Sequence, residues 1–176
     1  MSQILIAYYS MGGNTRRLAE EIRAATGADM EEIREPTPRR GFKGMMRALF
    51  DASLGRKPGI LATEHNPADY DLLVIGGPIW ARRLAAPVRT FAERYGTKAK
   101  QVAFFCTEGG KGAETGYTDL ERLSQHHAVA TLTVDAAHLD PAAHRSDLGH
   151  FLAGVRRNGA SKSNGSANRP NVEARH

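Results

Sequence analysis

The 176-residue sequence contains only one cysteine, Cys106, and no apolar run longer than a strand. A single cysteine cannot form an internal disulfide, and it excludes the usual metal sites that need several cysteines. The lack of an 18-residue apolar stretch excludes a transmembrane helix, and no charged leader followed by an apolar segment begins the chain. We therefore expect a single-domain cytoplasmic protein with no bound metal and no membrane span.

Two common phosphate-binding motifs are also missing. The chain contains neither G-x-G-x-x-G nor G-x-x-x-x-G-K-[ST], because Gly110-Lys111 lacks both the upstream glycine and the following hydroxyl residue. Their absence argues against a Rossmann-type dinucleotide fold and against an ATPase of the P-loop class.

Acidic residues are outnumbered, with 24 Lys and Arg against 19 Asp and Glu, which gives a formal net charge of +5. The excess is local. Residues 34–57 hold seven cations and two anions, and residues 156–176 hold five cations and one anion, so the remainder is mildly acidic. This distribution does not indicate a nucleic-acid-binding face. Because Gly, Ser, Asn and Lys dominate residues 158–176, we expect a disordered basic tail behind a domain of residues 1–157.

Near its start the chain has a strand, a short turn and a helix in succession. The apolar run 4–9 is typical of a buried strand, and Leu18, Ala19 and Ile22 recur at helical spacing before Gly27. The turn between them is predicted to hold a phosphate and consists of Ser10, Met11, Gly12, Gly13, Asn14 and Thr15. Hydroxyl donors and the first N–H groups of a helix favour an anion. An ordinary strand-to-helix turn is the alternative.

The same strand, loop and helix order recurs along the chain. Further strands are predicted at 30–33, 72–75, 102–106 and 129–134, and helices after Pro87, from about Tyr117 and from Asp140-Pro141. Residues 42–50 form an apolar helical stripe, which we expect to pack on the core rather than on a membrane or partner. Five β-α repeats predict an α/β fold with a parallel sheet and a ligand at the carboxyl ends of its strands.

Three loops at those strand ends resemble the loops of the flavodoxin family. Residues 10–15 resemble the family's [ST]-x-T-G-x-[ST] phosphate loop, with Gly12 in place of its middle hydroxyl residue. Residues 76–81 resemble the loop along one side of the isoalloxazine, with Trp80 where an aromatic residue packs on the ring. Residues 106–110 resemble the loop that lines the polar pyrimidine edge of the ring.

The resemblance implies a flavodoxin-like three-layer sandwich whose five-stranded parallel sheet has the order 2-1-3-4-5. It also implies non-covalently bound FMN as the cofactor. Besides the six residues of the phosphate loop, the implied FMN-binding residues are Pro78, Ile79, Trp80, Ala81, Cys106, Thr107, Glu108, Gly109 and Gly110. Glu108 would act as a carboxylate near the flavin or point into solvent, and Cys106 is also typical of a small core residue.

Three functions remain open, because in this family the flavin itself performs the chemistry. The first is an FMN-dependent NAD(P)H oxidoreductase resembling quinone reductases, which Arg82 and Arg83 beside Trp80 slightly favour. The second is an electron carrier that docks on a redox partner protein. The third is a flavodoxin-like domain without FMN that acts through protein contacts. The sequence specifies neither the donor, the acceptor nor the oligomer.

Overall fold

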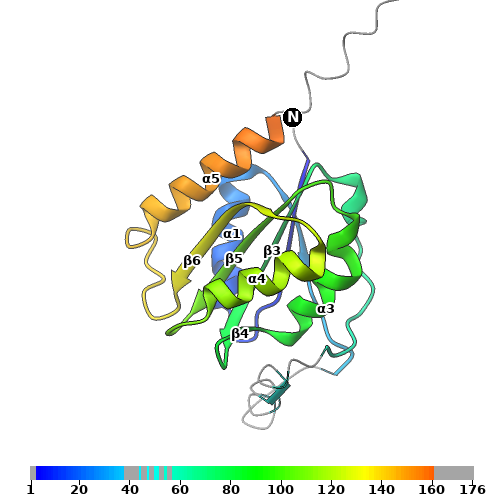
Figure 1. Ribbon diagram of the computed structural model, residues 1–176. Helices are drawn as coiled ribbons and strands as arrows, with labels where there is room; N and C mark the ends of the chain where they lie inside the picture. Colours follow the sequence, from blue (N-terminus) through cyan, green and yellow to red (C-terminus); the bar gives the residue numbers. More distant parts are fainter. Residues whose placement is uncertain are drawn as a thin grey trace, which may run out of the picture.

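The computed structural model has a twisted parallel sheet between two layers of helices (Figure 1). It describes residues 3–37, 44, 47, 50, 51, 54 and 57–160. The strands are β1 (Ile4–Tyr8), β2 (Asp29–Glu32), β3 (Leu72–Trp80), β4 (Arg83–Leu84), β5 (Val102–Glu108) and β6 (Ala128–Asp135). The parallel strands have the order β2-β1-β3-β5-β6, and β4 pairs antiparallel with β3. The predicted order 2-1-3-4-5 is therefore confirmed.

Alternating side chains of the strands face the two helical layers. Leu5, Leu73 and Phe104 belong to the core on the side of α3 (Ala86–Tyr95) and α4 (Ala113–Ser124). Their neighbours in sequence pack on the other side, against α1 (Asn14–Thr26) and α5 (Arg145–Ala160). Both faces are buried, which is why the central strands read as continuous apolar runs. Two short 3₁₀ helices, Pro67–Asp69 and Gly96–Lys98, precede β3 and β5.

The third strand is longer than the sequence suggests. Residues 76–80 were expected to form a loop, yet they continue β3 and then turn into the β3–β4 hairpin. Close packing explains the two glycines. A Cβ on Gly76 would lie 2.1 Å from ring atoms of Phe105, and one on Gly77 would lie 2.5 Å from Val88. These glycines therefore make room for neighbouring side chains rather than end the strand.

Two helix starts also differ from the prediction. α4 begins at Ala113 instead of about Tyr117. α5 begins at Arg145 instead of directly after Asp140, because the Asp140 carboxylate accepts a hydrogen bond from the Ala142 N–H and shapes a separate turn. α5 runs to Ala160, three residues past the expected domain limit, and residues 161–176 of the predicted tail lie outside the described residues.

The predicted helix over residues 42–50 lies largely outside the described residues. Of its apolar stripe only Phe50 is described. That residue is helical and 55% exposed, so at this position the expected core packing is wrong.

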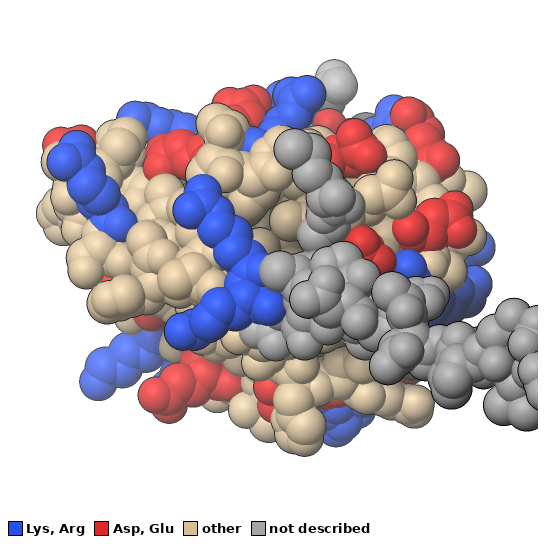
Figure 2. Space-filling model, turned by 90° about the horizontal axis from the view of Figure 1, so that it is seen from above, with Lys and Arg blue, Asp and Glu red and all other residues tan. Residues whose placement is uncertain are grey.

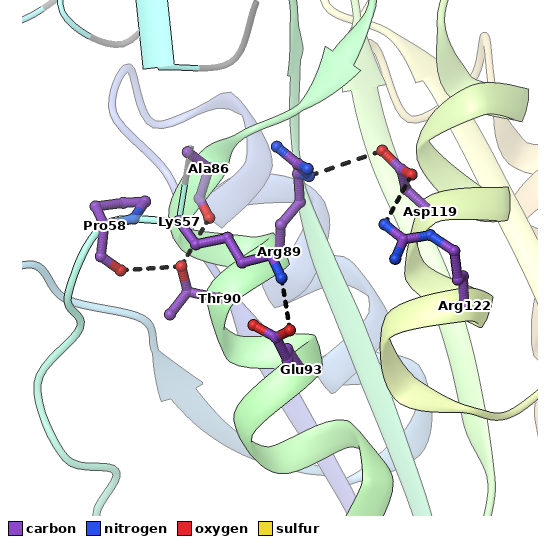
Figure 3. Close-up of polar contacts among 8 residues, drawn as sticks. All are labelled: Lys57, Pro58, Ala86, Arg89, Thr90, Glu93, Asp119 and Arg122. Atoms are coloured by element: carbon purple, nitrogen blue, oxygen red, sulfur yellow. Dashed lines mark hydrogen bonds and ion pairs between the residues drawn. The ribbon is translucent and has the colours of Figure 1, made fainter. Parts of the chain in front are cut away.

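α3 and α4 pack through a buried guanidinium, shown in Figure 3. Arg89 of α3 is 4% exposed, and its Nε lies 3.7 Å from Oδ2 of Asp119 on α4. Burial lowers the pKa of Arg89 below its usual value. On the other side of α3, the Thr90 hydroxyl donates to the Pro58 carbonyl at 2.9 Å. α3 is thereby fixed between α4 and the segment that begins at Lys57.

Surface charges of both signs are mixed at the end of the molecule where β1 begins. Figure 2 looks at this end, and Lys and Arg side chains there are interspersed with Asp and Glu side chains. In the described part of the chain, no helix combines the length and the apolar character that crossing a membrane requires.

Candidate functional site

The three predicted loops meet in one cleft at the carboxyl ends of the parallel strands. Its cavity volume is about 300 Å³, which falls at the lower end of small-molecule sites. The lining residues are Ser10, Met11, Gly12, Asn14, Thr15, Pro78, Ile79, Trp80, Thr107, Gly109 and Ala136. Ten of these eleven residues come from the sequence prediction. Gly13, Ala81, Cys106, Glu108 and Gly110 belong to the same loops but do not line the cleft.

The first loop ends at the N-terminus of α1. Gly13 precedes the helix with a φ of 91°, a left-handed conformation that glycine adopts without strain. Its N–H donates to Ser10 Oγ at 3.1 Å, which closes the turn, and no side chain caps the helix. The first intrahelical bond here runs from the Arg17 N–H to the Gly13 carbonyl. The preceding N–H groups therefore have no partner within the helix, and they create an anion-binding tendency beside the cleft.

A second polar feature lies at the base of the cleft. Thr15 of α1 and Thr107 of β5 place their Oγ1 atoms 2.9 Å apart, and the two residues are 1% and 2% exposed. Their hydrogen bond joins the first loop to the third.

The second loop is a tight hairpin. Ala81 and Arg82 connect β3 to β4 and both have left-handed backbone conformations, with φ of 48° and 63°. Such angles are costly for non-glycine residues and tend to persist where surrounding structure enforces them. The constraint here is Gly112, since a Cβ on Gly112 would lie 2.7 Å from the Arg82 Cα. The hairpin holds Trp80 at the cleft, where it meets Tyr9 edge-on at 5.9 Å between ring centroids.

The third loop is shorter than expected, because residues 102–108 are all part of β5. Cys106 faces the α3–α4 core, where its Sγ lies 3.1 Å from the Tyr117 hydroxyl, and burial raises the pKa of its thiol to about 11. The Glu108 carboxylate accepts a hydrogen bond from the Ala113 N–H at 3.1 Å. It therefore caps the first turn of α4, a role that neither the flavin nor the solvent interpretation included.

Ala136 is the lining residue that the sequence did not reveal. It follows β6, and its carbonyl accepts a hydrogen bond from the Asn14 side chain at 3.4 Å, while its N–H donates to the Glu108 carbonyl at 2.7 Å. Its neighbours Asp135 and Ala137 are neither glycine nor aromatic, so the local sequence does not mark this position as part of a site. Only the rule that parallel strands end at one edge of the sheet could have pointed to it.

The arginines after the first loop are already engaged. Arg16 donates to Glu32 at 2.7 Å and to the Tyr8 hydroxyl at 3.3 Å, and Arg17 lies 3.9 Å from Glu21. The charge of Arg16 is thus partly neutralised by β2 and that of Arg17 by Glu21 of α1 itself. Within the described residues, no group of three or more His, Cys, Asp and Glu side chains is placed to hold a metal ion.

Comparison with known proteins agrees with this arrangement of sheet and loops. The family model described as flavodoxin matches residues 3–132, which is most of the chain. The chain belongs to the flavodoxin family.

Solved structures of this fold extend the likeness along most of the chain. A flavoprotein of Lactobacillus acidophilus NCFM, solved in complex with FMN, is 21% identical with a TM-score of 0.66, over 84% of this chain and 99% of its own. A protein of Bacteroides eggerthii DSM 20697, described as a candidate flavoprotein, is 28% identical with a TM-score of 0.66, over 86% and 99%. The apo form of an NADH:FMN oxidoreductase is 16% identical with a TM-score of 0.61, over 98% and 100%.

Proposed function

We propose that the protein binds FMN in this cleft and uses it to transfer electrons. The observation that carries the proposal is the position of the cleft between the uncapped N-terminus of α1 and the half-buried Trp80. FMN has a dianionic phosphate at one end and a flat amphipathic ring at the other. The first-turn N–H groups suit the phosphate, and the wall of Pro78, Ile79 and Trp80 suits the ring.

The residues of the cleft hold and orient the cofactor. Bound FMN supplies both one-electron and two-electron transfer, so no side chain has to act as a nucleophile or base. Consistent with this, the one cysteine is buried, and its raised pKa keeps it protonated at neutral pH.

We further propose that NAD(P)H is the electron donor. Arg82 and Arg83 lie on the hairpin beside Trp80, and the close approach of Gly112 to Arg82 brings Lys111 to the same rim. Cations on the hairpin and the loop that border the cleft would attract an anionic dinucleotide. They would equally attract an acidic partner protein, so an electron carrier is the second candidate.

Purified protein distinguishes these functions. We expect it to carry FMN, or to take up added FMN, and to bleach on anaerobic addition of NADPH or NADH. FMN that is reduced by dithionite but not by either nucleotide would favour the carrier. A protein that takes up no FMN would contradict the proposal and favour a flavodoxin-like domain that acts through protein contacts.

The rim cations offer a sharper test of the donor. Replacing Arg82 and Lys111 by Ala should raise the KM for the nucleotide and leave FMN affinity unchanged, because neither residue lines the cleft. Lys98→Ala is the matched control, because Lys98 ends the 3₁₀ helix before β5 at the opposite edge of the sheet. Equal KM values in the wild-type protein, the Arg82→Ala/Lys111→Ala double variant and Lys98→Ala would exclude a role of this rim in nucleotide binding.

A further inference from the structure

The hydroxyl pair at the base of the cleft joins two elements that are far apart in sequence. Thr15 lies in the first turn of α1 and Thr107 near the end of β5, 92 residues later, with 2.9 Å between their Oγ1 atoms. Both residues line the cleft, and both are almost fully buried. Their hydroxyls are thus held together at the floor of the site and shielded from bulk water.

The pair has one more donor than it uses. Two hydroxyls carry two O–H protons, and only one proton can lie in the bond between them. In the described part of the chain, no further acceptor pairs with either Thr15 or Thr107 through its side chain. A buried donor without an acceptor is costly, so the pair favours a ligand group that only accepts hydrogen bonds. A phosphate dianion is such a group.

The position of each residue indicates which of the two hydroxyls donates to the other. Thr15 belongs to the helix turn whose free N–H groups face the phosphate site, whereas Thr107 lies behind it on the sheet. From this geometry we propose that Thr107 is a positioning residue. It donates its hydroxyl proton to Thr15 Oγ1, which turns the Thr15 hydroxyl proton toward the phosphate of FMN.

This inference rests on the proposed function, and it changes what the resemblance implied for Thr107. The resemblance placed that residue at the pyrimidine edge of the ring, at the opposite end of FMN. Its side chain instead lies on the α1 side of β5, the side of Phe105 two residues earlier, which packs with Leu18 and Ile22. The hydroxyl of Thr107 would therefore contribute to binding of the phosphate. Riboflavin has no phosphate, so its binding should not depend on this hydroxyl.

The test compares the dissociation constants of FMN and riboflavin, measured by quenching of flavin fluorescence. We expect Thr15→Val to raise the dissociation constant of FMN by about ten-fold and Thr107→Val to raise it by about three-fold. The dissociation constant of riboflavin should change by less than about two-fold in both variants. Thr107→Ser, which keeps the hydroxyl, should restore FMN affinity. The double variant Thr15→Val/Thr107→Val should bind FMN no more weakly than Thr15→Val alone, because Thr107 acts only through the Thr15 hydroxyl.

Thr133→Val is the matched control. It removes a hydroxyl from the neighbouring strand β6 that contacts Tyr117 at 2.9 Å on the α3–α4 side. It should leave the ratio of FMN to riboflavin affinity unchanged. Equal weakening of both flavins by Thr107→Val, or no rescue by Thr107→Ser, would overturn the inference and leave the proposed function intact. If the wild-type protein takes up neither flavin, the proposed function itself fails.

Discussion

Gly12→Thr is expected to tighten FMN binding, because it adds the hydroxyl that the first loop lacks. Gly12 lines the cleft and is exposed. A Cβ built on it meets no atom within 4 Å, and its φ lies outside the left-handed range, unlike that of Gly13. A threonine therefore fits without a clash and without backbone strain.

The size of the effect follows from two opposing contributions. A hydrogen bond to a charged group contributes about 1.5–3 kcal/mol. Ordering an exposed side chain that was free to rotate costs up to about 1 kcal/mol. The net gain is about 1 kcal/mol, which corresponds to about five-fold tighter FMN binding.

The assay is a fluorescence titration of the apo protein with FMN and with riboflavin. Gly12→Val is the control, because valine has the shape of threonine without the hydroxyl. The gain should appear for FMN alone and in the threonine variant alone. Equal FMN affinity in the two variants, or an equal gain for riboflavin, would refute the placement of the phosphate beside Gly12.

Three further predictions concern the scaffold. Gly76→Ala should destabilise the protein by about 1–3 kcal/mol in urea unfolding, because its Cβ would lie 2.1 Å from the Phe105 ring, and Phe105→Leu in the same chain should restore part of the loss. Cys106 should resist a thiol reagent at pH 8 in the folded protein and react only after unfolding, since burial raises its pKa to about 11; fast labelling of folded protein would contradict this. Burial and the bond to Asp29 raise the pKa of Tyr70 from 10.0 to about 12, so the free energy of unfolding should fall as the pH rises through this interval, and Tyr70→Phe should remove that part of the decline.

Most of the strands could be predicted because they have a strong local signal, whereas the order of the strands came from the resemblance to the flavodoxin family. The run Leu72–Ile75 is continuously apolar, and the helices that follow the strands show apolar spacing of their own. The extension of β3 through Gly76 and Gly77 could not be predicted. Gly and Pro are typical of loops, and only the distant Phe105 and Val88 show that these glycines are packing positions within a strand.

The early start of α4 could not be predicted either, because a glycine in it is also a packing position. Gly116 lies inside the helix and weakens the helical pattern, yet a Cβ there would lie 3.0 Å from Ile79 and 3.6 Å from Leu84. The glycine lets α4 approach the β3–β4 hairpin closely. The sequence contains both partners, but their contact depends on a hairpin whose tip, Ala81-Arg82, has none of the Asn-Gly character that usually marks such turns.

The third loop shows what strand alternation adds to a motif. The resemblance to the family places Cys106, Thr107 and Glu108 together in one FMN-binding loop, but in β5 successive side chains point to opposite faces of the sheet. Thr107 meets Thr15 on the α1 side, while Cys106 meets Tyr117 on the α3–α4 side. A strand that continues past its apolar run can therefore present only every second residue to one face. Because this continuation depends on pairing with β6, up to Glu108 opposite Asp135, the sequence motif alone could not separate a site residue from a core residue.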